Sequence, residues 1–383
     1  MSEKLTNKII LVEFLLMGLP GDWVIETFHA ALFFLIYLTA LMGSPLIFTL
    51  TTVDQHLQTP MYFSARISIP EKLANITIIM EFLLMGFPDD WMLQRLYAAL
   101  FFLIYLTALT GNLLIVALTT IDLHLHAPMF FFLKNLSLID IGFISVTVPK
   151  SIMNSLTKSH SISFLGCASQ IFLFLFFGST EYALLVVMSY DRYAAICHPL
   201  RYETIMNRGS CVQMVTVSWL SGFVYGSIHV TGTFSVNFYG PNIVHQFFCD
   251  IPSLLTLACP GEQILEYAFI IASFSFAFLC FLFMIVSYVH IFSAVLRIPS
   301  AQGRFKIVST CMPHLTVMAL FLFSGVVTYL GTNYKPASSL NLFMSVLYSV
   351  LPPSLNPVIY SLRNRDMKAA LGKLLGGKML LKM

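Results

Sequence analysis

The stretch MSYDRYAAICHPLRY, residues 188–202, places Asp191, Arg192 and Tyr193 at the end of a long run of apolar residues. Arg192 keeps its charge in any protein environment, and a charged side chain at the centre of a bilayer costs about 2.5 to 3.5 kcal/mol. The acid and the arginine therefore belong at the rim of a membrane, where a helix ends. Their position at this boundary indicates a switch.

The composition of the whole chain indicates a polytopic membrane protein. Of its 383 residues, 57% are hydrophobic and only 10% are charged, and the mean hydropathy is +0.82. These values exclude a soluble domain. The net charge of +3 is too small to indicate a nucleic-acid partner. The Lys and Arg residues lie between apolar runs and near the C-terminus, so their positions indicate which loops lie on which side of the membrane.

One large repeat marks the amino-terminal part of the chain. Residues 11–23 return as residues 79–91, and residues 29–63 return as residues 97–131, with an offset of 68 throughout. Nothing after residue 131 repeats, so the pattern is a doubled amino-terminal unit and not the internal symmetry of a transporter.

The first copy of this unit differs from the second in its buried centre. It has Ser44-Pro45 where the second has Asn112-Leu113, so it lacks the amide and carries a proline in mid-span. We interpret residues 1–70 as an extension that contains a degenerate duplicate of the first span. It either inserts as an eighth span, remains outside the membrane as an apolar liability, or stems from a spurious upstream start.

Long apolar runs set the predicted fold. A helix needs about 20 residues to cross about 30 Å of hydrocarbon. Runs of this length lie near 28–53, 96–121, 128–150, 167–190, 211–233, 264–292, 307–330 and 339–361. We therefore predict an all-α membrane protein: a seven-transmembrane helix bundle over residues 71–375, the degenerate duplicated first span within residues 1–70, and a basic cytoplasmic tail at residues 376–383.

The distribution of basic residues predicts the orientation. With the amino terminus of the seven-helix bundle outside, and counting the loops and tail from Arg95 onward, twelve Lys and Arg residues lie inside and four lie outside, which satisfies the positive-inside bias. The outside four are Arg95, Lys150, Lys158 and Lys335. The sequon Asn75-Ile-Thr77 then lies outside, so we expect Asn75 to be a glycosylation site in a multi-pass plasma-membrane protein.

Four polar side chains share one depth in four different spans. At about 1.5 Å per helical residue, Asn112, Asp140, Glu181 and Asn356 all lie roughly 10 to 16 Å above the cytoplasmic face. Such groups cannot face lipid, so they converge on the bundle interior. Two neighbouring carboxylates are expected to share a proton or a sodium ion at Asp140 and Glu181. The alternative is a static polar contact between helices.

These motifs resemble the odorant-receptor family of rhodopsin-like G-protein-coupled receptors. The sequence AICHPLRY follows Arg192, and Asn356-Pro357-Val-Ile-Tyr360 precedes SLRN. Residues 303–315, GRFKIVSTCMPHL, are similar to the family's basic start of the sixth helix. The resemblance covers roughly residues 71–375 and implies a seven-helix receptor for odorants.

The resemblance also implies roles for the switch residues. Asp191, Arg192 and Tyr193 would form the cytoplasmic end of the third helix, and Tyr360 would move inward to meet Arg192 in the open state. Tyr288, near the end of the fifth span, would stabilise that state. His314 would be a neutral hydrogen-bonding partner in the bundle or a pH-sensitive contact. A heterotrimeric G protein of the stimulatory type would enter the opened cytoplasmic mouth.

Two cysteines match the family's disulfide bond. Cys167 at the start of the third span would bridge Cys249 in the loop that follows the fourth span. In the family pattern a cysteine ten residues before Cys249 bridges the one at Cys259. This chain has Tyr239 at the earlier position, so that second bridge cannot form.

By resemblance, the odorant site lies in the outer half of the bundle, above the polar layer. Its residues are apolar with a few hydroxyls, which suits a small, volatile, largely hydrophobic molecule. They lack the fixed counter-charge that an amine or acid transmitter requires. The predicted lining residues are Phe174, Leu175, Gly178, Ser179, Ala272, Phe276, Leu322, Gly325, Val326, Tyr329 and Ser349.

No enzyme motif is present in the sequence. It has no phosphate-binding glycine loop, no zinc-type spacing of Cys and His, and no nucleophile elbow, and we interpret His124 and His126 as loop residues. The function prediction is an odorant receptor that activates a stimulatory G protein. The alternatives are a poorly folded, non-signalling product and, third, a polytopic transporter.

Overall fold

The computed structural model describes residues 81–87, 90–122, 125, 127–157, 159–238, 242–259, 261, 263–296, 314–319, 321–328, 339–363 and 365–375. The predictions for residues 1–70, Asn75, Tyr329 and the tail after residue 375 lie outside these ranges, and so do those for the side chain of Tyr360. All the described residues belong to one compact unit, Ala74–Met383.

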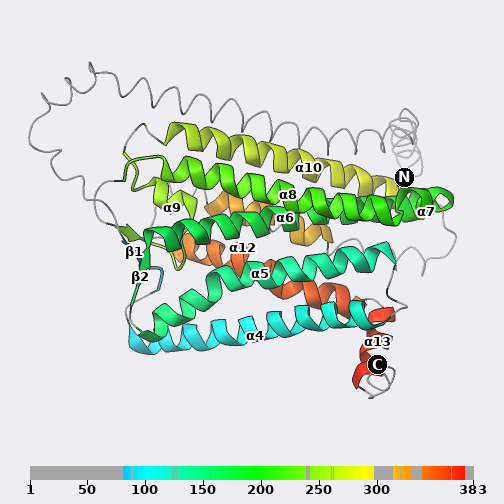
Figure 1. The fold of residues 1–383 in the computed structure, drawn as a ribbon, viewed down its shortest axis with the longest axis horizontal. Helices are drawn as coiled ribbons and strands as arrows, with labels where there is room; N and C mark the ends of the chain where they lie inside the picture. Colours follow the sequence, from blue (N-terminus) through cyan, green and yellow to red (C-terminus); the bar gives the residue numbers. More distant parts are fainter. Residues whose placement is uncertain are drawn as a thin grey trace, which may run out of the picture. The chain divides into compact units, whose positions relative to one another are not determined.

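Long apolar helices form the bundle, as predicted. Six helices are long and apolar enough to cross a membrane, and a shorter apolar helical segment spans His314–Thr328. The long helices lie side by side with α6 in the centre (Figure 1). Their bounds are α4 Trp91–Ile121, α5 Pro128–Thr157, α6 Phe164–Cys197, α8 Arg208–Phe234, α10 Ile264–Leu296 and α12 Ser339–Arg363.

Several helices extend beyond the predicted apolar runs. Arg95 and Lys150, expected on the outer side of the membrane, lie within α4 and α5. Side-chain caps explain where three helices begin: Asp90 accepts hydrogen bonds from the backbone of the first turn of α4, Ser163 caps α6, and Asn207 caps α8. Each cap satisfies backbone N–H groups that have no partner within the helix.

A small three-stranded sheet, which the sequence did not predict, covers one end of the bundle. Its strands are β1 Glu81–Leu84, β2 Ser161–Ser163 and β3 Ile243–Val244, in the order β2-β1-β3. Strand β1 pairs antiparallel with β2 and parallel with β3. Two membrane-length helices separate β1 from β2 in the sequence, and two more separate β2 from β3. All three strands therefore lie at the same end, which we call the sheet end.

The opposite end carries short helices. The 3₁₀ helix Pro199–Arg201 and helix α7, Tyr202–Ile205, follow α6, and α13, Arg365–Leu375, follows α12. Helix α13 buries Met367 and Ala370, and its Lys373 Nζ lies 3.5 Å from Asp122 Oδ2 at the end of α4. Helix α13 therefore packs one face on the bundle.

Small residues let α8 pack closely against α6. A Cβ atom at Gly222 would clash with Thr180 Oγ1 and lie 2.7 Å from the carbonyl oxygen of Phe176. A Cβ atom at Gly226 would lie 3.0 Å from the carbonyl oxygen of Phe172. Close approach of helices at small residues is the usual packing mode in membranes.

Candidate functional site: a buried polar cluster and its surroundings

The structure brings Asp140, Glu181 and Asn356 together in the middle of the bundle. Asn356 Nδ2 lies 3.1 Å from both carboxylate oxygens of Asp140 and 2.9 Å from Glu181 Oε1. The three side chains are at most 1% exposed. One amide nitrogen has only two hydrogens for these three oxygens. Helices α5, α6 and α12 are thus joined at one point, which we call the polar cluster.

Asn112, the fourth residue of the predicted layer, has a different partner. Its Nδ2 donates to the carbonyl oxygens of Ala108 (3.0 Å) and Pro353 (2.9 Å). Because Pro357 has no N–H, the carbonyl of Pro353 loses its partner within α12. Asn112 on α4 supplies the missing donor to the carbonyl of Pro353. This bond joins α4 to α12 three residues before Asn356.

Oxygen atoms of the polar cluster could hold a cation. Within the described part of the chain, Glu181 Oε2 and Asn356 Oδ1 are buried and have no hydrogen-bond partner. Carboxylate and amide oxygens suit a hard cation, and two buried carboxylates need a compensating charge or proton. The donor set therefore fits sodium, with Asp140 and Glu181 as its anionic ligands.

The predicted switch residues lie at the opposite end of α6. Tyr202 donates its hydroxyl hydrogen to Asp191 Oδ1 at 2.7 Å. Burial, together with the neighbouring Asp191 carboxylate, raises the pKa of Tyr202, so the hydroxyl remains a donor. Arg192 donates from Nη2 to Met129 Sδ at the start of α5, and Tyr193 makes a 3.1 Å hydrogen bond with His198.

His314 has the hydrogen bond expected of a partner within the bundle. The hydroxyl of Tyr288 on α10 and Nδ1 of His314 lie 2.6 Å apart, and both side chains are buried. This bond joins α10 to the segment His314–Thr328. Tyr288 therefore contacts the predicted sixth span in this structure.

Aromatic rings occupy the region between the polar cluster and the sheet end. The ring of Phe174 lies 4.8 Å from Phe143, 5.1 Å from Phe248 of the loop after α8, and 5.5 Å from Tyr348 on α12. One turn below, a Cβ atom at Gly178 would lie 3.5 Å from Phe143 and 3.7 Å from Phe321. Phe174 and Gly178 thus face the bundle interior directly above Glu181.

The other residues of the predicted odorant site are more scattered. The hydroxyls of Ser179 and Ser349 bond back to carbonyls of their own helices, at 2.6 Å each. Leu175, Phe276, Leu322 and Gly325 are half-buried, whereas Ala272 and Val326 are exposed. An apolar cavity of about 80 Å³ lies between α12 and residues 314–328, and Phe321, which borders Gly178, lines it.

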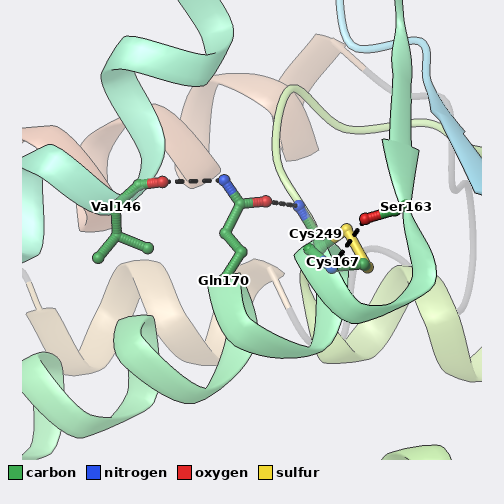
Figure 2. The surroundings of a disulfide bond; sticks show 6 residues. Val146, Ser163, Cys167, Gln170 and Cys249 are labelled. Atoms are coloured by element: carbon green, nitrogen blue, oxygen red, sulfur yellow. Dashed lines mark hydrogen bonds between the residues drawn. A yellow bond between two sulfur atoms is a disulfide. The ribbon is translucent and has the colours of Figure 1, made fainter.

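A disulfide bond holds the loop after α8 over the bundle. It joins Cys167 to Cys249, with Cα atoms 5.5 Å apart (Figure 2). Gln170, one turn along α6, accepts a hydrogen bond from the backbone N–H of Cys249 and donates to the carbonyl of Val146, both at 2.9 Å. The loop is therefore fixed by a covalent bond and by an amide that links α5, α6 and the loop.

Sequence reasoning missed this amide and a buried hydrogen bond between a histidine and a glutamate. His229 on α8 and Glu266 on α10 lie 2.6 Å apart and are 2% and 1% exposed. Their signal was in the sequence, because an ionisable residue inside an apolar span marks a packed or functional position. Gln170 carried the weaker signal of a single amide in an apolar run.

Comparison with known proteins decides the family. A family model described as "Olfactory receptor" matches residues 101–378. The chain is 53% identical to Olfactory receptor 14A16 of Homo sapiens over 307 residues, which are 80% of this chain and 99% of that protein. The chain belongs to the olfactory receptor family.

Other relatives of this olfactory receptor give the same result. It is 53% identical to the human Olfactory receptor 14L1 over 302 residues, 79% of this chain and 93% of that protein. It is 43% identical to Olfactory receptor 1E16 of Mus musculus over 297 residues, 78% and 95% of the two chains. The family resemblance read from the motifs is confirmed, and this olfactory receptor is a multi-pass signalling receptor and not an enzyme.

Proposed function

We propose that this olfactory receptor binds a small, mostly hydrophobic odorant on the sheet side of the polar cluster and activates a stimulatory G protein from the opposite end. Membership of the family supports odorants and a G protein as its partners. The single observation that carries the proposal is the position of Phe174 and Gly178. They lie on α6 among aromatic rings, and Glu181 follows one turn later on the same helix.

The polar cluster supports a link between the two ends. Helices α6 and α12 meet at Asn356, and the segment His314–Thr328 meets α6 where Phe321 borders Gly178. An odorant that displaces the aromatic rings around Gly178 therefore moves at least one of these three elements. A ligand shifts an equilibrium only through different contacts in the two states. In the open state the sixth span would leave Arg192, and the G protein would enter there.

The sheet end is proposed to face outward at the plasma membrane. The disulfide bond lies at that end, and disulfides form and persist in oxidising compartments. The basic residues of the opposite end, including Arg201 and Arg208, agree with the positive-inside bias. The proposal places the amino terminus of the seven-helix bundle, with Asn75, outside.

A cell-based response tests the odorant site. We expect hydrophobic odorants to raise cyclic AMP in cells that express the receptor with a stimulatory Gα subunit. Gly178→Leu should lower the potency of bulky odorants at least about tenfold, because its side chain enters the space between Phe143 and Phe321. Gly372→Ala, at a position where a Cβ atom meets nothing within 4 Å, is the control.

Three outcomes would contradict the proposal. A receptor that reaches the cell surface and raises no cyclic AMP for any odorant in a broad panel would be the non-signalling product. A response that needs an inhibitory Gα subunit would overturn the stimulatory coupling. Unchanged potencies in Gly178→Leu would place the odorant elsewhere.

Sodium binding at the polar cluster is tested by stability. We expect the purified receptor to unfold at a higher temperature in sodium chloride than in choline chloride at equal ionic strength, because a bound ligand stabilises the state that binds it. Asp140→Asn should abolish the difference. A sodium effect of equal size in this variant would move the ion away from Asp140 and Glu181.

A further inference from the structure

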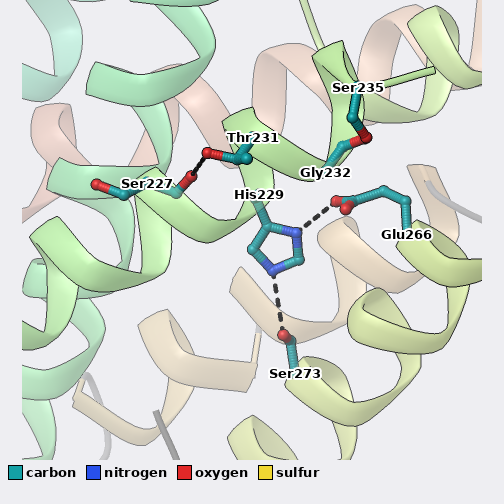
Figure 3. Close-up of polar contacts among 7 residues, drawn as sticks. All are labelled: Ser227, His229, Thr231, Gly232, Ser235, Glu266 and Ser273. Carbon is teal, nitrogen blue, oxygen red and sulfur yellow. Dashed lines mark hydrogen bonds and ion pairs between the residues drawn. The ribbon is translucent and has the colours of Figure 1, made fainter. Parts of the chain in front are cut away.

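Helices α8 and α10 meet through a polar contact that the proposed function does not use. His229 Nδ1 donates to Glu266 Oε1 at 2.6 Å, and His229 Nε2 lies 3.2 Å from Ser273 Oγ (Figure 3). The imidazole of α8 thus lies between two side chains of α10 that are seven residues, or about two turns, apart. We call these three residues the α8–α10 clamp.

The surroundings of Glu266 are shaped to receive its carboxylate. A Cβ atom at Gly232 on α8 would clash with Glu266 Oε2. Glu266 lies in the first turn of α10, where the helix dipole favours a negative charge. Its neighbours Ile264 and Ile271 are 69% and 66% exposed, whereas Glu266 is 1% exposed. The polar side of α10 therefore points at α8 and its apolar side points at lipid.

Two contacts on one face determine the rotation of a helix about its axis. Turning α10 would carry Glu266 and Ser273 away from His229 together and leave a buried carboxylate without its donor, which is costly in an apolar environment. The position of α8 is itself fixed on its other side, because Gly222 and Gly226 pack against backbone of α6. The clamp thus fixes the rotation of α10 relative to α8, and through α8 relative to α6, which carries Phe174 and Gly178.

The predicted odorant residues of α10 flank the clamp. Ala272 precedes Ser273 by one residue, and Phe276 follows it by one turn. Any change in the rotation of α10 therefore moves both. We propose that His229 is a positioning residue for odorant specificity, which acts through Glu266 and Ser273 by setting how far the half-buried Phe276 reaches toward the odorant. This inference rests on the proposed function.

A native thiol reports the rotation without any odorant. Cys280 follows Ser273 by seven residues, so Glu266, Ser273 and Cys280 lie along one face of α10. Its thiol is half-buried. A turn of α10 changes its exposure, which the rate of alkylation measures by mass spectrometry on the full chain in lipid nanodiscs.

The decisive variants are His229→Ala, Gly232→Ala and Ser273→Ala. We expect each to change the alkylation rate of Cys280 about fivefold, the effect of one lost hydrogen bond on an equilibrium. We also expect each to alter the order of potency within a homologous series of odorants. The methyl group of Gly232→Ala contacts only the Glu266 side chain. This variant therefore still tests the clamp if His229→Ala does not fold.

Two hydroxyls beside His229 provide matched controls. Ser227 Oγ donates to the carbonyl of Phe223 at 2.8 Å, within α8. Thr231 Oγ1 donates to the carbonyl of Ser227, also at 2.8 Å (Figure 3). Ser227→Ala and Thr231→Ala should leave the Cys280 rate and the odorant order unchanged.

The two possible failures are distinguishable. Folded His229→Ala and Gly232→Ala variants with the wild-type Cys280 rate and the wild-type odorant order would overturn the clamp. A wild-type chain that gives no cyclic AMP with any odorant, while Cys280 still reports the variants, would overturn the proposed function and keep the clamp as a determinant of α10 rotation alone.

Discussion

Asp250 is a buried acid in the loop that covers the sheet end. It follows Cys249 of the disulfide bond and precedes α9, Ile251–Leu255, and it is 4% exposed. Burial raises its pKa from 3.8 to about 7. Because the folded loop holds the neutral acid more easily than the carboxylate, the folded state binds the proton more tightly than the unfolded state does.

This shift predicts that acid stabilises the loop. The contribution of Asp250 is fully present below its unfolded pKa and is lost as the pH rises through about 7. Between pH 6 and pH 8 the loss should be about 1.4 kcal/mol. Asp250→Asn should remove this part of the pH dependence and raise the unfolding temperature at pH 8. Thermal unfolding of both proteins at the two pH values checks it, and an identical pH slope in the variant would refute it.

The depth of a polar side chain within its span could be predicted from the sequence, whereas its contact partner on the neighbouring helix could not. Counting residues from the helix ends placed Asp140, Glu181 and Asn356 at one level, because the rise per residue is fixed. The hydrogen bond from Asn112 to Pro353 and the one between His229 and Glu266 depend on which face of each helix meets its neighbour. That is decided by packing, which no single span encodes.

At the scale of the element, the contact between α6 and α8 predicts intolerance of any side chain at Gly222. Gly222→Ala would place a methyl group against Thr180 Oγ1 and the carbonyl of Phe176. Since backbone must move, we expect a loss of about 1 to 3 kcal/mol, seen as a lower unfolding temperature.

The control for this prediction is another helical glycine. Gly372 in α13 has nothing within 4 Å of its Cβ position. Gly372→Ala should therefore be neutral or stabilise α13 by up to about 1 kcal/mol, because alanine favours helices. Equal destabilisation by the two substitutions would show that close packing at Gly222 is not the cause.

The three strands of the sheet could not be predicted from the sequence pattern. Strands of four, three and two residues are too short for an alternating pattern. Their pairing partners lie about 80 and 160 residues away from β1 in the sequence. The membrane-spanning helices, by contrast, could be predicted from the length of the apolar runs alone. The observed helix ends differ from the predicted ones by several residues, where polar caps and basic side chains extend the helices.

At the scale of the whole molecule, the disulfide bond predicts a large effect. It closes a chain segment with a sequence separation of 82 residues. Replacing Cys167 and Cys249 by serine should cost about 2 to 5 kcal/mol and reduce surface expression, measured by antibody labelling of intact cells. Cys197→Ser is the control, and normal surface expression of the double variant would contradict the prediction.

The amino-terminal repeat leads to a prediction about the full chain. A version that starts at residue 71 should reach the cell surface and carry a glycan on Asn75, because it matches the length of a seven-span receptor. Surface labelling and glycan mobility of both versions provide the measurement. Arrival of the full chain with its amino terminus in the cytoplasm would instead establish eight spans.

The central place of β1 in its sheet imposes an order on biosynthesis. Strand β1 leaves the ribosome first, yet its two partners follow only after two and after four spans have been made. Until β3 arrives, the edge of β1 is available to other chains. The sheet can be completed only after α4, α5, α6 and α8 have been made, so a chain that ends before β3 leaves one edge of β1 unpaired.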